Sequence, residues 1–371
     1  MIPAGGGLAV VLGMGPSGLF VSRQIARTGR AVAAIAREDD LGRHSRSIVS
    51  GGCAVATSSE EVAEALAAFK DRFGPLNAVP SSDQYLTLLL QEKSERLEAF
   101  GMEAKEIRNF RLINDKKELV KTLNESMNIP TSCGLRNFGD EILRYPCILK
   151  WREKVIGRSS KAVPKAVIVR NRAEAEAMLE KVLAEGFSVD DFMLQELVSG
   201  DNSQQYSFGG YYEDGTLLAG IAVNQIGQYP QGISACVVES NDEHAIEAEE
   251  RSRLFAAKLR FSGFLEMEYK ADGRSGELYL LDVNPRPWGW VSILGAKYPD
   301  FSSVFSGIAP EPIEERVCWK NPLRAPLCRR NPLNVKKSVR ACKVTYDILD
   351  AKDMGPLFAL PLVAARKVAR K

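Results

Sequence analysis

The sequence predicts an α/β or α+β architecture of the kind found in enzymes. Three observations support this prediction. A buried-strand pattern at 8–13 runs into Gly13-x-Gly15-x-x-Gly18, and a helical pattern follows. Strand and helix patterns then alternate along the chain, as in α/β and α+β enzymes. Further on, two strand patterns at 264–270 and 277–284 carry polar side chains among apolar ones.

Length and composition bound the class of protein. The chain has 371 residues, which suggests two or three domains at roughly 100–200 residues each. Apolar residues make up 45% and the net charge is +2, values typical of a globular protein. The only histidines, His44 and His244, argue against a His-rich metal centre. Seven cysteines without CxxC spacing favour a reducing, cytoplasmic location, and no targeting or membrane-spanning segment is expected.

The glycine motif has the context of a dinucleotide-binding turn. It follows a strand, opens a helix, and precedes a strand at 31–36 and the acidic residues Glu38, Asp39 and Asp40. Glycines there let the backbone approach a pyrophosphate at a helix N-terminus. Two interpretations stay open: an NAD or FAD site, or a tight turn of a Rossmann-like domain that binds no dinucleotide. The second is favoured, because nothing downstream resembles a hydride-transfer site.

Helical and strand patterns alternate between residues 60 and 259. Pro130 ends one helical pattern, because proline cannot continue a helix. The turn EDG at 213–215 separates two strands. The expected helices are 60–70, 82–100, 115–127, 172–185 and 242–259, and the expected strands are 146–150, 166–169, 192–198, 204–212 and 216–223.

The strand pair near the C-terminal third carries the strongest chemical signal. Glu266 and Glu268 lie two residues apart and share one strand face, as do Asp282 and Asn284. If the strands pair, carboxylates and an amide oxygen converge, and Arg286 lies two residues further on. Such oxygen donors suit Mg²⁺, which completes its shell with phosphates and water. A solvated strand face is the alternative, but LYLLDVNP is too hydrophobic for an exposed strand.

Three spaced lysines form the second signal. Lys116 opens a helix, Lys150 ends the strand PCILK, and Lys165 precedes the strand at 166–169. Lysines that end buried strands direct charge into clefts, where phosphate is a common partner. Each alone would be read as a surface side chain. Together with the polar strand pair they indicate a nucleoside triphosphate held between two subdomains.

The order of these features resembles the ATP-grasp superfamily over residues 8–308. The likeness is carried by INDKKELVKTLNESMNIPT, PCILK, FMLQELVSGD and GFLEMEYKADGRSGELYLLDVNPR, of which the last is the most specific. NPRPWGW and NQIGQYPQG are similar to predicted ATP-dependent carboligases related to the carbamoyl-phosphate synthase large chain. The resemblance implies a Rossmann-like pre-ATP-grasp domain at 1–112, an ATP-grasp domain at 113–308 with subdomains 113–187 and 188–308, and a basic C-terminal extension at 309–371.

The resemblance also implies the site residues. Glu268, Asp282 and Asn284 would bind Mg²⁺, with Mn²⁺ as an alternative, and Arg286 would be catalytic. ATP would be held by Lys116, Lys150 and Lys165, by backbone groups of Gln195, Glu196, Leu197 and Val198, and through its ribose by Asp201.

Two positions depart from the pattern of the superfamily. Asp282 stands where many members have Glu, which shortens the arm by one methylene and keeps the charge. The phosphate lid at 151–164 has a single glycine, Gly157. The lid lysine is therefore either Lys161 or Lys165, and Lys165 is favoured because it abuts a strand.

The activity implied is ATP-dependent joining of a carboxylate to an amine or related nucleophile through an acyl phosphate. The partners would be small molecules, and no nucleic acid is expected. An NAD- or FAD-dependent oxidoreductase that uses the glycine turn is the main alternative. An ATP-binding module without catalysis is another.

The C-terminal extension is strongly basic. Residues 316–346 hold nine basic side chains and no acidic one, and Asn-Pro pairs predict loop through much of the segment. A solvated extension is the plain interpretation. Peripheral contact with an anionic membrane is the sharper one. The sequence does not predict an oligomeric state.

Overall fold

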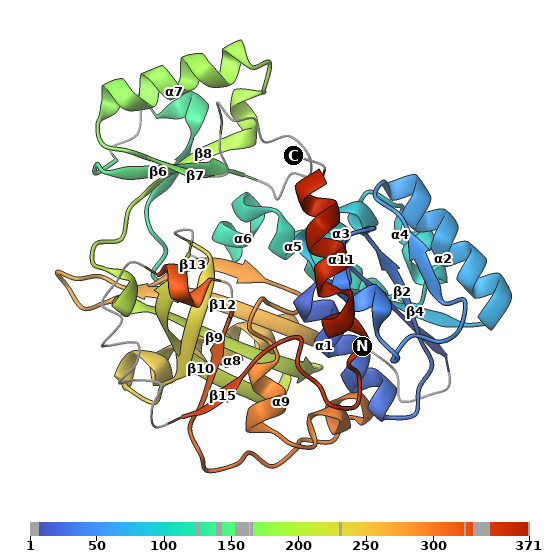
Figure 1. The fold of residues 1–371 in the computed structure, drawn as a ribbon. Coiled ribbons are helices and arrows are strands. Elements are labelled where there is room, and N and C mark those ends of the chain that lie inside the picture. Colours follow the sequence, from blue (N-terminus) through green and yellow to red (C-terminus); the bar gives the residue numbers. More distant parts are fainter. Residues whose placement is uncertain are drawn as a thin grey trace.

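The part of the chain that the structure describes forms three β-sheets (Figure 1). The computed structural model describes residues 7–123, 127–138, 143–152, 163, 166–229, 232–322, 324–328 and 342–369.

The N-terminal unit is a parallel sheet with strand order β3-β2-β1-β4. Strands β1 and β2 are buried along their whole length, because their sequences are uninterrupted apolar runs that suit a parallel sheet covered on both faces. This arrangement agrees with the expected Rossmann-like domain. Its elements are β1 (Leu8–Leu12), α1 (Pro16–Arg27), β2 (Val32–Ala36), η1 (Leu41–His44), β3 (Cys53–Val55), α2 (Ser59–Phe73), β4 (Leu76–Pro80), α3 (Asp83–Leu90), α4 (Ser94–Ala99) and α5 (Ala104–Asn114).

A small antiparallel sheet, with order β5-β8-β6-β7, forms the part at the upper left of Figure 1. Its core joins apolar residues of the strands to one face of α7. Strand β8 lies within the range 188–308 expected for the second subdomain, yet it pairs with β5 and β6, so the small sheet extends to Glu196. The elements here are β5 (Ser132–Gly134), η2 (Leu135–Asn137), β6 (Cys147–Trp151), β7 (Ala166–Val169), α7 (Arg172–Ala184), η3 (Val189–Asp191) and β8 (Phe192–Glu196). Helix α6 (Lys116–Leu123) precedes them and packs beside α5.

The largest sheet has seven strands in the order β13-β12-β9-β10-β11-β14-β15. Helix α8 packs on it and adds Ala245, Ala248, Phe255 and Ala256 to the core. The elements are η4 (Asn202–Gln204), β9 (Gln205–Glu213), β10 (Thr216–Gln228), β11 (Ser234–Glu239), α8 (Glu243–Leu259), β12 (Gly263–Ala271), β13 (Leu278–Asn284), α9 (Ile293–Lys297), η5 (Phe301–Ser306), β14 (Val317–Lys320), η6 (Ala325–Leu327) and β15 (Lys343–Thr345).

The C-terminal extension is integrated into the body. Strand β14 pairs with β11, and β15 pairs with β14 in parallel. Helix α11 (Gly355–Ala369) then lies against the N-terminal unit beside η1 (Figure 1). Five of the nine basic residues at 316–346 fall in 329–341, outside the described residues.

A buried ion pair fastens this extension to the N-terminal unit. Arg23 in α1 is 7% exposed, and its Nε donates to Asp353 Oδ2 at 2.8 Å. The Arg23 guanidinium also donates to backbone carbonyls within 347–353, and Asp353 accepts from Ser45 Oγ at 2.6 Å. Because every partner is buried or half-buried, these contacts make the segment around Asp353 part of the folded core.

Asp347 ties the same segment to the large sheet. Its Oδ1 accepts from Ser292 Oγ at 2.7 Å and from Trp319 Nε1 at 2.6 Å. Burial raises the pKa of Asp347 to about 6, and the two hydrogen bonds only partly oppose this shift.

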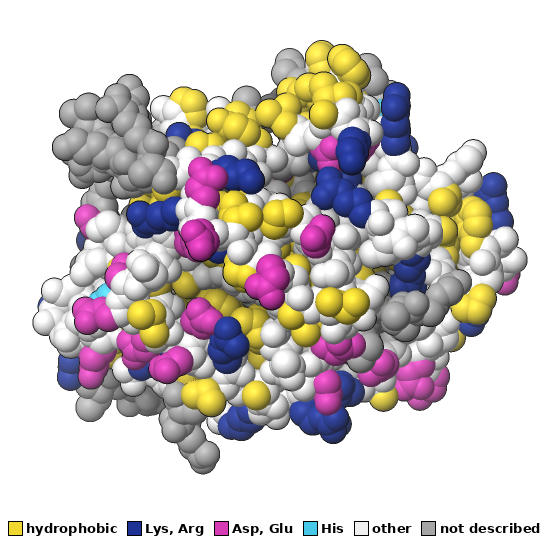
Figure 2. All heavy atoms as spheres, turned by 90° about the horizontal axis from the view of Figure 1, so that it is seen from below, with side chains coloured by type: hydrophobic (Ala, Val, Ile, Leu, Met, Phe, Trp, Pro, Cys, Tyr) yellow, Lys and Arg dark blue, Asp and Glu magenta, His cyan; other side chains and the backbone are white. Residues whose placement is uncertain are grey.

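The surface shows no single-sign field on the face drawn in Figure 2, where basic and acidic side chains are interspersed. In the part of the chain that the structure describes, no helix has the length and apolar character needed to cross a membrane.

Candidate active site

Strands β12 and β13 bring the predicted polar residues together. Their antiparallel register sets Glu268 opposite Asp282 and Glu266 opposite Asn284. The two-residue spacing places all four on one face, as the sequence predicted. Asn284 Nδ2 donates to Glu266 Oε2 at 3.1 Å and to Glu268 Oε1 at 3.2 Å.

The donor set fits a magnesium ion that also binds phosphate. Glu266 and Asn284 are buried, whereas Glu268 and Asp282 are half-buried. Among the described residues, no group of three or more His, Cys, Asp or Glu side chains is placed to hold a metal. Mg²⁺ needs fewer protein ligands than that, because it keeps waters and phosphate oxygens in its shell.

Arg286 connects this hairpin to the N-terminal unit. Its Nε and Nη2 donate to Asp83 Oδ1 and Oδ2, both at 2.7 Å, and Nη2 also donates to Asn284 Oδ1 at 3.2 Å. Burial alone would lower the pKa of Arg286, but the negative charge of Asp83 raises it overall. In this orientation Asn284 Oδ1 faces Arg286, and the Nδ2 group faces Glu266 and Glu268. The amide would have to rotate for Oδ1 to bind a cation held by the carboxylates.

Two of the predicted lysines share a cavity with the hairpin. Lys116 Nζ lies 3.8 Å from Asp282 Oδ1, and Lys150 Nζ donates to Gln195 Oε1 at 2.7 Å. The cavity measures about 30 Å³, room for about one water, so a nucleotide enters only if the small sheet and β13 separate. All four residues line it, and its remaining walls are apolar: Leu119, Val120, Leu123, Ile129, Met193, Leu280, Leu281 and Val283.

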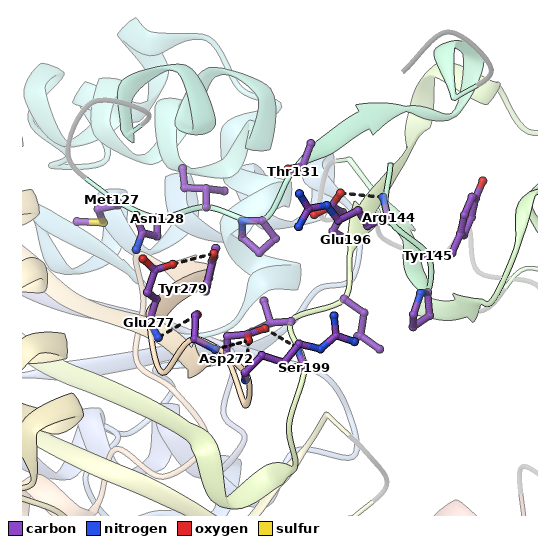
Figure 3. A pocket seen from close by; sticks show the side chains of 17 residues that line it. Met127, Asn128, Thr131, Arg144, Tyr145, Glu196, Ser199, Asp272, Glu277 and Tyr279 are labelled. Carbon is purple, nitrogen blue, oxygen red and sulfur yellow. Dashed lines mark hydrogen bonds between the residues drawn. The ribbon is translucent and has the colours of Figure 1, made fainter. Parts of the chain in front are cut away.

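A larger cavity of about 830 Å³ lies on the other side of the end of β8 (Figure 3). It is lined by Glu196, Leu197 and Val198, by the turn between β12 and β13, and by loops at 127–131 and 144–146. In Figure 3 the side chains of Arg144 and Glu196 stand opposite those of Asp272 and Glu277. The structure therefore divides the predicted nucleotide-binding residues between two cavities.

Backbone groups of the segment predicted to bind adenine are already engaged. Glu196 N donates to Thr131 O at 2.8 Å, and Leu197 N donates to Pro146 O at 3.0 Å. Val198 O accepts from Lys270 Nζ at 2.9 Å. Adenine recognition through this segment therefore stays a prediction.

One further predicted residue, Asp201, does not line the cavity that holds Lys116 and Lys150. Asp201 is exposed and accepts from the amide and hydroxyl of Ser203. Lys165 and the alternative lid residue Lys161 lie outside the described residues.

The glycine turn is closed by its own chain. Met14 N donates to Asp40 Oδ2 at 3.0 Å, and Gly42 N donates to Met14 O at 2.9 Å. Asp40 is 5% exposed, so this acidic residue folds onto the turn instead of standing open for a ribose. A Cβ at Gly18 would lie 1.8 Å from Gly13 O, so close packing within the turn is enough to require that glycine.

Two polar neighbours of the hairpin were missed by the sequence analysis. Gln205 Nε2 lies 3.4 Å from Glu268 Oε2, and Gln228 Nε2 donates to Gln205 Oε1 at 2.7 Å. Asp83 was also missed. Its signal is an acidic residue just after the carboxyl end of a parallel strand, where ligands gather in α/β folds, but strand β4 itself was not predicted.

Comparison with solved structures decides the fold. A crystal structure of N5-carboxyaminoimidazole ribonucleotide synthetase in complex with ADP superposes with a TM-score of 0.63 at 14% identity, covering 86% of this chain and 81% of that one. An L-amino acid ligase from Bacillus licheniformis gives a TM-score of 0.57 at 15% identity, covering 83% and 75%. The chain has the ATP-grasp fold.

Another solved structure shows the same fold. A carboxyaminoimidazole ribonucleotide synthase from Aspergillus clavatus, solved with ATP, gives a TM-score of 0.59 at 13% identity, covering 84% of this chain and 80% of that one. No family model and no curated protein matches the sequence. The resemblance inferred from the hairpin and lysine stretches is thus confirmed for the fold.

Proposed function

We propose that the protein is an ATP- and Mg²⁺-dependent ligase that joins a small-molecule carboxylate to an amine through an acyl phosphate. The observation that supports this most is the shared cavity: Lys116 and Lys150 line it together with Asp282 of the hairpin. Cationic side chains beside facing carboxylates suit a nucleotide triphosphate carried with a divalent cation. Proteins of the same fold include an L-amino acid ligase and enzymes solved with ADP or ATP.

In this proposal the two sheets hold ATP between them. Lys116 and Lys150 bind phosphate oxygens, and the apolar walls of their cavity cover the base. Glu268, Asp282 and Asn284 would hold Mg²⁺, which would neutralise phosphate charge when bound. The remaining assignments are Lys165 at the phosphates, backbone groups of Gln195, Glu196, Leu197 and Val198 at adenine, and Asp201 at the ribose.

The reaction requires alignment more than covalent catalysis. A carboxylate oxygen of the substrate attacks the γ-phosphorus, and ADP leaves. The amine then attacks the acyl carbon, and inorganic phosphate leaves. Arg286, which lies 3.2 Å from Asn284 at the edge of the hairpin, positions the carboxylate and stabilises developing negative charge.

Nucleotide binding tests the first part of the proposal. Titration calorimetry with Mg-ATP should show binding, whereas NAD and FAD should show none. Binding of NAD or FAD in place of Mg-ATP would instead support the oxidoreductase alternative.

Turnover tests the second part. ADP release should require both an added carboxylate and an amine or hydroxylamine. Mg-ATP binding without turnover for any acid in a broad panel would favour a non-catalytic ATP-binding module.

A further inference from the structure

We infer that Asp83 and Arg286 form a two-charge subsite, and that the carboxylate substrate is an α-amino acid whose ammonium group binds Asp83. This inference rests on the proposed function and names its substrate class. Arg286 would hold the carboxylate of the same molecule. The amino acid would thus lie across the pair with each of its charges beside the opposite one.

The hydrogen bonds of Arg286 lead to this inference. A guanidinium offers two parallel donors to a carboxylate along either its Nε–Nη2 edge or its Nη1–Nη2 edge. At Arg286 the second edge is partly used, because Nη1 donates to Pro287 O at 3.0 Å and Nη2 to Asn284 Oδ1 at 3.2 Å. Asp83 already occupies the Nε–Nη2 edge with two bonds of 2.7 Å. A substrate carboxylate must therefore approach Arg286 with the carboxylate of Asp83 as its immediate neighbour.

Charge then discriminates between substrates. A simple carboxylate meets a pair whose charges cancel, and it is repelled by Asp83 as much as it is attracted by Arg286. A zwitterion offers an ammonium group to Asp83 and a carboxylate to Arg286. Asp83 is suited to this contact, because its side chain is 39% exposed while that of Arg286 is 15% exposed.

Other acidic groups near Arg286 also bear on which charge a substrate would meet. Glu266 and Asp282 also act on Arg286 electrostatically. A divalent cation at the hairpin would neutralise charge there. Asp83, which belongs to the N-terminal unit, would then be the carboxylate that attracts the ammonium group of the substrate.

A cavity beside Arg286 suggests the first probes. It measures about 50 Å³. Most of its lining is apolar, including Met102, Phe110 and Phe264. Small apolar amino acids are therefore the starting members of the panel.

The experiment compares each amino acid with its deamino analogue. Purified full-length protein is given Mg-ATP, hydroxylamine and either alanine or propionate, then further L- and D-amino acids with their analogues. Hydroxylamine displaces phosphate from an acyl phosphate and leaves a coloured hydroxamate, so the natural amine need not be known. For at least one pair, we expect kcat/KM for the amino acid to exceed that for the analogue at least tenfold.

The variant Asp83→Asn isolates the subsite. It should lower the amino-acid to analogue ratio at least tenfold. Because Asp83 also positions Arg286, the ratio and not the absolute turnover is the readout. Asp214→Asn is the matched control, because Asp214 also pairs with an arginine, Arg260, and its side chain is 40% exposed. The control should leave the ratio unchanged. Asp83→Glu should restore part of the preference, which a merely structural role for Asp83 would not require.

The outcomes separate this inference from the proposed function. Hydroxamate from analogues at rates equal to those from amino acids, or a ratio that Asp83→Asn does not move, would overturn the inference and leave the ligase proposal standing. Absence of Mg-ATP binding, or of hydroxamate from every acid, would overturn both. If Asp83→Asn does not fold by thermal unfolding, the wild-type ratio and Asp83→Glu still decide.

Discussion

Glu268 and Asp282 stand directly opposite each other on neighbouring strands. Like charges in such cross-strand pairs destabilise a sheet. Lys116 and the Asn284 amide offset part of this repulsion. The remaining repulsion between Glu268 and Asp282 would be relieved by a divalent cation bound between them.

Replacing one of the facing carboxylates should separate stability from function. We expect Asp282→Asn to raise the free energy of unfolding without metal by up to about 1 kcal/mol, because the cross-strand repulsion disappears. The same variant should weaken Mg-ATP binding at least tenfold. Urea unfolding and calorimetry measure the two effects. Asp190→Asn, at a well-exposed surface pair with Arg136, is the control for both.

Removing the ammonium group of Lys150 should weaken nucleotide binding. Its Nζ lies 2.7 Å from Gln195 Oε1 in the cavity that we assign to ATP. A hydrogen bond from a charged group contributes about 1.5–3 kcal/mol, so Lys150→Met should raise the Kd for Mg-ATP roughly tenfold to a hundredfold. Lys121→Met, on an exposed helix pair with Glu118, should leave the Kd unchanged. Equal Kd values for the two variants would contradict the assignment.

Stability should depend on pH through Asp347. Burial raises its folded pKa from 3.8 to about 6. Between these values the folded state keeps a proton that the unfolded state has released, so stability falls as pH rises from about 4 to about 6. The loss amounts to about 3 kcal/mol at 1.36 kcal/mol per pKa unit.

The variant Asp347→Asn tests this dependence. An asparagine Oδ1 can accept the same two hydrogen bonds, from Ser292 and Trp319. The variant should match the wild type near pH 4 and become the more stable protein above pH 6. Urea midpoints across that range measure the difference, and parallel curves would show that Asp347 does not titrate as described.

The buried ion pair of the C-terminal extension should matter more than its exposed neighbour. Asp353→Ala leaves Arg23 buried without its carboxylate, and such losses cost about 3–5 kcal/mol. Asp350→Ala removes the pair with Arg27, whose side chain is 45% exposed, and should cost under about 1 kcal/mol. Chemical denaturation of both variants provides the comparison. A similar cost for both would argue that the extension is not part of the cooperative core.

Two glycines of one motif should respond differently to alanine. At Gly18 a Cβ would lie 1.8 Å from Gly13 O, so Gly18→Ala must displace the turn and should prevent stable folding. At Gly15 a Cβ would meet nothing within 4 Å, and φ is −66°, which alanine also adopts. We expect Gly15→Ala to cost less than about 1 kcal/mol, the scale of a helix N-cap change. Soluble yield and thermal unfolding distinguish the two.

The features that could be predicted from the sequence are those with a local cause. The positions of Glu268 and Asp282 on one face follow from strand periodicity alone. Strand β7 was predicted at 166–169, where the structure has it, because a short β-branched run lies between polar stretches. The strands predicted at 204–212 and 216–223 also rest on local sequence patterns, and they cover most of β9 and the first part of β10.

The features that could not be predicted depend on contacts between distant residues. Arg286 and Asp83 are 203 residues apart, and no spacing rule relates them. Strands β14 and β15 lie in a basic, proline-bearing segment whose composition favours loop. They are strands because β14 pairs with β11 and β15 pairs with β14. Asp347 and Asp353 look like surface residues until their partners are known.

The attachment of α1 by residues near the other end of the chain has a consequence during synthesis. Arg23 leaves the ribosome 330 residues before Asp353 does. Until then helix α1 carries an arginine whose final carboxylate and carbonyl acceptors have not yet been translated. The unit around the parallel sheet is therefore completed only after the segment at 347–353 is made, and a nascent chain stopped short of Asp353 should expose that unfilled place to chaperones and proteases.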